Sequence, residues 1–263
     1  MSCAIRLIIA ILLFLFAPGQ DARDTVTSIV ARIQRADFED DRPTLARVSA
    51  ELAPFVENSA LASHVHYWRG FALWRRALNA QNEPTPPPGV EDDLTQAAAE
   101  FHKAFAIDPK FADAKGGEAY CLINLSVLHQ KEPRGREWYV RSRALLDEAL
   151  VAEPENPRLL WLLSGYEFYQ PAESGGGPTK ALSTQERALG LAQRQKGRTS
   201  DPLEPAWGEP ELLMALAYTH LTLATPDVAA AERYAQRALA LVPYWHFVRD
   251  ILMQRIQNAK AKA

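Results

Sequence analysis

A spacing of small and apolar residues that ends in proline recurs along this chain and constrains it to stacked helices. The spacing places residues at offsets 0, 4, 7 and 12, and its complete copies are Ala97, Phe101, Ala104 and Pro109; Ser142, Leu146, Ala149 and Pro154; and Ala231, Ala235, Ala238 and Pro243. Two partial copies lack the proline: Ala181, Gln185 and Ala188, and Ala46, Ala50 and Ala53. Offsets 0, 4 and 7 lie on one helical face, where small residues let a neighbouring helix approach, and proline ends the helix. The pattern therefore predicts helices that pack in pairs.

Apolar residues at spacings of three and four predict helices over most of the chain. The predicted ranges are 24–37, 43–56, 59–80, 93–107, 111–130, 136–152, 157–170, 178–194, 209–224, 227–241 and 243–259. No run alternates with period two over six residues, so we expect no sheet. Three loops rich in proline or glycine separate helices, at 83–89, 170–178 and 197–210. The sequence predicts an all-α fold.

The repeated spacing resembles that of the tetratricopeptide repeat family over roughly residues 43–243. The segment WLLSG at 161–165, followed by Phe168, is similar to the family's W-x2-L-G-x2-Y first helix. Looser versions are HYWRG at 66–70, Gly117 with Tyr120, and Leu213 with Leu216 and Ala217. The resemblance implies a right-handed α-solenoid of about five helix pairs whose concave face binds protein segments.

The last predicted helix, 243–259, carries an apolar stripe of Trp245, Val248, Leu252 and Ile256. A stack of helical repeats exposes an apolar face at its end, and a further helix has to cover it. We therefore expect this helix to be a C-terminal cap. Docking of the helix onto a partner is the alternative.

The N-terminus has the layout of a secretory signal peptide. A short basic segment precedes the apolar run LIIAILLFLF at 7–16, and Ala17 and Gly19 supply small residues for cleavage. We expect a signal peptide at 1–19, a helical repeat domain at 20–263, and a periplasmic or secreted location. The alternative is an uncleaved anchor formed by residues 7–17, which would hold the protein at a membrane.

Helical spacing also predicts which residues face a groove, if Gly70, Gly117, Gly165 and Ala217 mark equivalent positions of the first helices. The candidate partner or ligand groove consists of His64, Tyr67, Phe71, Trp74, Glu118, Tyr166, Tyr169, Met214 and Tyr218. Aromatic side chains give a large contact area with few rotors, which suits binding. The alternative is that these aromatic residues belong to the core. Trp68 and Trp161 are assigned to packing between helices.

Composition and motifs argue against several other classes of protein. The net charge of −3 gives no basic surface for nucleic acid. Neither an HExxH motif nor a cysteine–histidine cluster is present, so we expect no metal site and no cofactor. No serine lies in a G-x-S-x-G elbow, so the sequence gives no support for catalysis by a nucleophilic serine.

The sequence leaves two functions open. The first is a non-enzymatic exported scaffold that binds a protein or peptide partner in its concave groove. The second is a small-ligand-binding accessory of a TRAP-type transport system, because secreted tetratricopeptide proteins linked to such transporters look similar. In that case an aromatic-lined cavity of residues such as Tyr67, Trp74, Tyr166 and Tyr218 would hold an apolar or carboxylate ligand. The partner's identity and the oligomeric state stay open.

Overall fold

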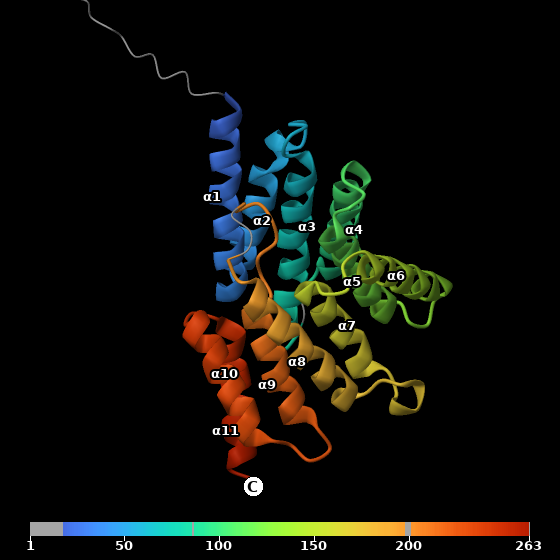
Figure 1. Ribbon diagram of the computed structural model, residues 1–263, viewed down its shortest axis with the longest axis vertical. Helices are drawn as coiled ribbons and strands as arrows, with labels where there is room; N and C mark the ends of the chain where they lie inside the picture. The colour runs from blue at the N-terminus through green and yellow to red at the C-terminus, as the bar shows by residue number, and fades with distance from the viewer. Residues whose placement is uncertain (1–17, 86, 198–200, 263) are drawn as a thin grey trace, which may run out of the picture.

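The computed structural model describes residues 18–85, 87–197 and 201–262, and folds them into helices joined by loops (Figure 1). The α-helices are α1 (Pro18–Glu39), α2 (Arg42–Glu51), α3 (Ala62–Asn79), α4 (Val90–Ile107), α5 (Ala112–Leu128), α6 (Pro133–Ala152), α7 (Pro157–Tyr169), α8 (Pro178–Gln195), α9 (Glu209–Thr222), α10 (Val228–Leu241) and α11 (Met253–Lys260). Short 3-10 turns lie at Ala53–Phe55, Ala80–Asn82 and Ala172–Ser174, and a π-helical turn, Phe247–Leu252, precedes α11. No strand occurs in these ranges, which confirms the all-α class.

Local chemistry explains where several helices begin. The side chain of Asn156 accepts hydrogen bonds from the backbone N–H groups of Arg158 and Leu159, and α7 starts at the next residue, Pro157. Asp227 caps α10 in the same way, with its carboxylate 2.8 Å from the backbone nitrogen of Ala230. Each predicted range overlaps an observed helix because these caps and prolines are local signals.

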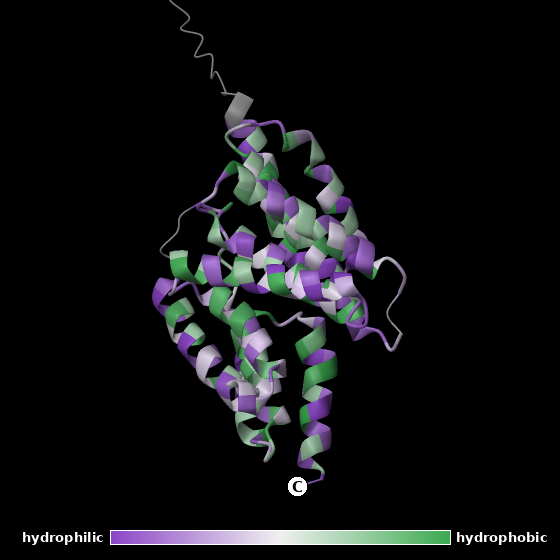
Figure 2. Ribbon diagram, turned by 90° about the vertical axis from the view of Figure 1, so that its right-hand side faces the viewer, coloured by the Kyte–Doolittle hydropathy of each residue, from purple (hydrophilic) through white to green (hydrophobic). Residues whose placement is uncertain are grey.

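Consecutive helices pack in pairs: α3 with α4, α5 with α6, α7 with α8, and α9 with α10. The first helices of these pairs bury residues on most sides, whereas the second helices bury mainly one stripe. Hydrophilic and hydrophobic residues accordingly mix along the ribbons (Figure 2). This arrangement confirms the predicted pairing, while the right-handed solenoid stays a prediction.

The buried stripe of the second helices is the repeated spacing itself. Every residue at offsets 0, 4 and 7 of the three complete copies is fully buried. The partial copy at Ala181, Gln185 and Ala188 is also buried. The copy proposed at Ala46, Ala50 and Ala53 is wrong, because Ala50 and Ala53 are exposed. The buried face of α2 instead holds Leu45, Ser49 and Leu52, each one residue earlier.

Phe101 of α4 lies in a slot between two glycines of neighbouring helices. A Cβ atom added at Gly70 of α3 would lie 3.1 Å from the Phe101 ring, and one added at Gly117 of α5 would lie 2.7 Å from it. The glycines therefore allow the phenyl ring to fill the space between α3 and α5. This contact is the close approach that the repeated spacing predicts.

The last turns of the chain return to the first helix. The ring of Trp245 meets that of Phe38 in α1 edge to face, with centroids 4.8 Å apart, and Arg35 lies 3.8 Å above the ring of Tyr244. The predicted C-terminal stripe of Trp245, Val248, Leu252 and Ile256 is buried, partly against α10. The cap is therefore formed, and the residues that lead into it contact the C-terminal end of α1.

The proposed signal peptide and the alternative anchor at 7–17 lie outside the described residues, apart from Pro18 and Gly19. Within residues 18–85, 87–197 and 201–262, no helix combines the length and apolar character needed to cross a bilayer.

We predict that Gly117→Ala destabilises the fold by roughly 1–3 kcal/mol, because the new methyl group would overlap the Phe101 ring. Gly190→Ala is the matched control, since only the flexible end of Arg194 lies near its added Cβ. The control variant is expected to be more stable than the wild type by up to about 1 kcal/mol, because alanine has a higher helix propensity than glycine. Urea unfolding of both variants measures the difference in their free energies of unfolding. Equal values would contradict the packing of Phe101 between the two glycines.

Candidate functional site

The segment at 201–208, between α8 and α9, covers the inner face of α3. The Trp68 indole N–H donates to the backbone carbonyl of Leu203 at 2.8 Å, and Leu203 is fully buried. The Trp207 indole N–H donates to the hydroxyl oxygen of Tyr67, also at 2.8 Å. His64 lies 3.2 Å from a carboxylate oxygen of Glu204. The chain therefore fills this part of its predicted groove with its own loop.

An aromatic cluster forms the centre of the molecule where this segment ends. The ring of Trp207 lies 5.8 Å from that of Trp74 in α3 and 5.6 Å from that of Trp161 in α7, measured between centroids. Tyr120 of α5 stacks on Trp161 at 5.7 Å. Rings from three helices and one loop thus hold each other in fixed positions, and one face of this cluster is open to a cavity.

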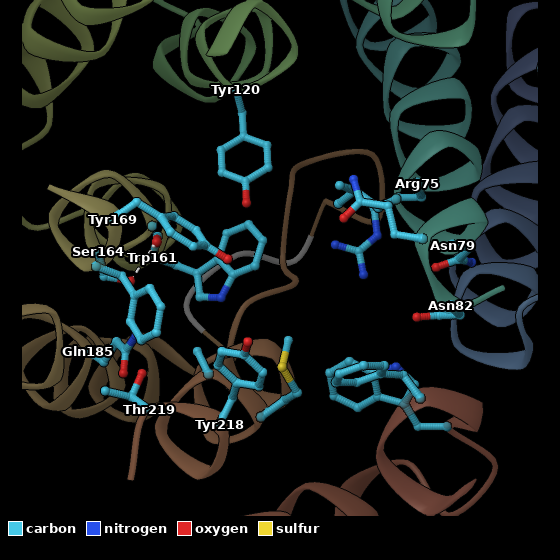
Figure 3. Close-up of a pocket in the computed structure, with 18 of the residues that line it drawn as sticks. Arg75, Asn79, Asn82, Tyr120, Trp161, Ser164, Tyr169, Gln185, Tyr218 and Thr219 are labelled. Atoms are coloured by element: carbon cyan, nitrogen blue, oxygen red, sulfur yellow. Dashed lines mark hydrogen bonds between the residues drawn. The ribbon is translucent and has the colours of Figure 1, made fainter. Parts of the chain in front are cut away.

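The cavity lies between α3, α5, α7, α9 and the C-terminal turns, with a volume of about 370 Å³ (Figure 3). Its apolar wall consists of Tyr120, Trp161, Phe168, Tyr169, Met214, Tyr218, Trp245 and Phe247. The hydroxyl groups of Tyr120 and Tyr218 and the guanidinium of Arg75 are directed into the space (Figure 3). Phe247 belongs to the π-helical turn, a distortion that is frequent at functional sites. Aromatic walls with a few polar groups are typical of ligand sites.

Arg75 places a buried positive charge at one end of this cavity. Its Nε donates to a carboxylate oxygen of Asp37 in α1 at 2.8 Å, and both side chains are buried. The Asn79 amide also donates to Asp37, which fixes the carboxylate. The carboxyl group of Glu211 is buried nearby and accepts a hydrogen bond from the backbone N–H of Gly208. Burial raises the pKa of Glu211, and Arg75 opposes the shift.

Two further features complete the polar lining. Arg255 of α11 is exposed at the cavity and forms no ion pair with any described residue. At the α7–α8–α9 end, Ser164, Gln185 and Thr219 are buried polar residues. Burial also raises the pKa of Tyr120 to about 12, so its hydroxyl stays protonated and can donate a hydrogen bond at neutral pH. The cavity therefore offers aromatic walls for an apolar ring, with Arg75 paired to Asp37 and Arg255 unpaired among the described residues on its lining.

A second cleft, of about 380 Å³, adjoins the first. Tyr120, Gly165 and Tyr169 line both spaces. The second cleft extends over α5 and α6 to residues that are largely exposed, including Val127 and Tyr139.

The structure separates the nine predicted site residues into groups. Tyr169, Met214 and Tyr218 line the first cavity, and Tyr166 lines the second together with Tyr169. The predicted groove residues Tyr67, Phe71 and Trp74 are only 1% exposed. The prediction that these three residues line an open groove is corrected, because the aromatic cluster and the 201–208 segment cover them.

The two remaining predicted residues contact polar or charged side chains of other elements. His64 pairs with Glu204 in the covering segment. Glu118 is buried away from the groove, where it bonds His102 of α4 at 3.0 Å and Arg141 of α6 at 2.5 Å. Glu118 therefore joins the second helices of two pairs, and its prediction as a groove residue is corrected.

Sequence reasoning missed most of the polar lining of the cavity. Arg75 directly follows the apolar run at 71–74, and Gln185 stands where other copies of the repeat have an apolar residue. Both departures from pattern are signals that could have pointed to a site. Trp161, assigned to packing, is part of the cavity wall as well. The described residues hold no group of three or more histidine, cysteine or acidic side chains arranged to bind a metal ion.

Comparisons with known proteins give one informative match. No protein-family model matches the sequence, and no curated protein matches it. Among solved structures, the HusA haemophore from Porphyromonas gingivalis is similar in fold, with a TM-score of 0.61 and 19% sequence identity. The match covers 79% of this chain and 97% of that chain. At this identity the likeness concerns the helical fold.

We predict that Glu211→Gln makes stability less sensitive to pH. The folded-state pKa of Glu211 is raised, so its contribution is fully present below the unfolded pKa, about 4.3, and is lost as the pH rises through the folded value. Glutamine keeps an oxygen for the Gly208 N–H and carries no charge. Urea unfolding is expected to give similar stabilities at pH 4, with the variant increasingly more stable toward pH 8. Parallel pH profiles would contradict this assignment.

Proposed function

We propose that this protein is an exported, non-enzymatic binding protein whose cavity takes a flat, apolar ligand with carboxylate groups, of the tetrapyrrole class that includes haem. The single observation that carries the proposal is the aromatic-walled cavity with Arg75 and Arg255 on its lining. A tetrapyrrole offers a broad π-face for the walls and propionate groups for the arginines. The signal-like start supports export.

The fold comparison supports the same ligand class. HusA is named a haemophore, and the match spans nearly the whole of that protein. Of the side-chain types that hold haem iron in proteins, a methionine and tyrosines line this cavity: Met214, Tyr120, Tyr169 and Tyr218. When haem is bound, Met214 and Tyr218 are the candidates to contact its iron, and the other rings would pack on the macrocycle.

Binding of a peptide segment is the second candidate function, and membership of the tetratricopeptide repeat family remains part of it as a proposal. The observation that favours it is the second cleft, where exposed apolar residues, Val127 and Tyr139, adjoin Tyr169. The covered position of Tyr67, Phe71 and Trp74 argues against a peptide in the N-terminal part of the groove.

Titration of the purified protein tests the proposal. Haem and iron-free protoporphyrin IX are each expected to quench tryptophan fluorescence, because Trp161 and Trp245 lie in the cavity wall. Binding of haem is expected to change its visible absorption spectrum through the side chains around the iron. If neither the tryptophan fluorescence nor the absorption spectrum of haem changes at micromolar ligand, the protein does not bind tetrapyrroles.

We predict that Arg255→Gln weakens porphyrin binding about threefold to tenfold, because a hydrogen bond from a charged donor to a propionate is lost. The melting temperature is expected to stay unchanged, since Arg255 is exposed and unpaired among the described residues. Arg233→Gln is the matched control, because Arg233 is also exposed and does not line the cavity. Equal porphyrin affinities of the two variants would show that Arg255 does not contact the ligand.

A further inference from the structure

Gln185 is a buried polar residue whose side chain makes no hydrogen bond to the described residues. Its side chain lines the cavity from α8 and is 3% exposed. Its amide oxygen is buried and has no partner. Leaving such a group unpaired is costly, because its hydrogen bond to water in the unfolded chain is not replaced. The unpaired amide therefore points to a group that is absent from the folded chain.

The repeat makes this residue stand out further. In the complete copies of the spacing, the equivalent position holds Phe101, Leu146 or Ala235, all fully buried. An apolar residue at 185 would satisfy the packing of α8 without the cost of an unpaired amide. Polar residues that break a local rule in this way are expected at functional sites.

Two hydroxyl groups accompany Gln185 at the same end of the cavity. Ser164 of α7 is buried and donates its hydroxyl proton to the backbone carbonyl of Trp161 at 2.7 Å, which leaves its oxygen able to accept. Thr219 of α9 is 1% exposed and also lines the cavity. Figure 3 shows the three residues on the α7–α8–α9 side, with Arg75, Asn79 and Asn82 across the cavity on the α3 side.

We propose that Gln185, with Ser164 and Thr219, forms a second polar subsite that hydrogen-bonds the edge of the ligand opposite its carboxylates. The inference rests on the proposed function and narrows its ligand. The propionates lie toward Arg75 and Arg255, the macrocycle lies on the aromatic walls, and the far edge carries a hydrogen-bond donor, a hydroxyl or an amide N–H, for the unpaired amide oxygen. A tetrapyrrole with only vinyl or ethyl groups on that edge leaves Gln185 unpaired.

Two iron-free porphyrins with the same propionates test the subsite. Protoporphyrin IX has vinyl groups on the edge opposite the propionates, and haematoporphyrin IX has 1-hydroxyethyl groups there. Wild-type protein is expected to bind haematoporphyrin about threefold to tenfold more tightly, the effect of one buried hydrogen bond. Gln185→Leu is expected to abolish the preference. Gln193→Leu, an exposed change on the same helix, is expected to keep it.

Stability of the unliganded protein gives an independent measurement. Gln185→Leu is expected to raise the melting temperature, because it removes an unpaired buried amide. A lower melting temperature would show that the folded chain pairs the amide, and would overturn the inference. Thr219→Val keeps the side-chain shape and is expected to reduce the haematoporphyrin preference, so the subsite remains testable if Gln185→Leu does not fold.

The outcomes separate the subsite from the function. Binding of both porphyrins with equal wild-type affinity, or a preference that survives in Gln185→Leu, overturns the subsite and leaves tetrapyrrole binding in place. Binding of neither porphyrin overturns the proposed function and, with it, the ligand assigned to Gln185.

Discussion

The contact of Trp207 with Trp74 and Trp161 is the interaction on which the rest of the structure depends. The three rings come from the segment between α8 and α9, from α3 and from α7, so they join parts of the chain that are far apart in sequence. Large rings in edge-to-face contact leave little freedom for the elements that carry them. The cluster therefore fixes α3 relative to α7, and this spacing determines the width of the cavity beside Trp161.

The cavity combines a rigid apolar wall with polar groups that the fold alone does not require. Arg75 and Asp37 form a buried ion pair, which contributes little stability when an apolar pair could replace it. Glu211 and Gln185 add further buried polar groups around the same space. Natural proteins tolerate such costs where a site needs the groups, so the polar lining is better explained by binding than by folding.

The loop at 201–208 limits what the helix pairs can bind, because it covers one face of α3. Leu203 and Trp207 occupy the inner face of α3, where a peptide would lie in an open stack of helix pairs. The space that stays open lies farther along, between α3, α7, α9 and the C-terminal turns. A compact cavity of this kind suits a small rigid ligand, whereas a long groove suits an extended peptide.

The sequence by itself determined the helices, their pairing and the buried stripe of the second helices, because caps, prolines and apolar spacing act within a few residues. It also placed Tyr169, Met214 and Tyr218 on the open side of their helices. Only the tertiary structure decided that Tyr67, Phe71 and Trp74 are covered, since the covering segment follows them by more than 120 residues. It likewise brought Arg75, Gln185 and Arg255 to one cavity. No periodicity within a helix encodes contacts between α3, α8 and α11, because they depend on how the pairs curve back toward α1.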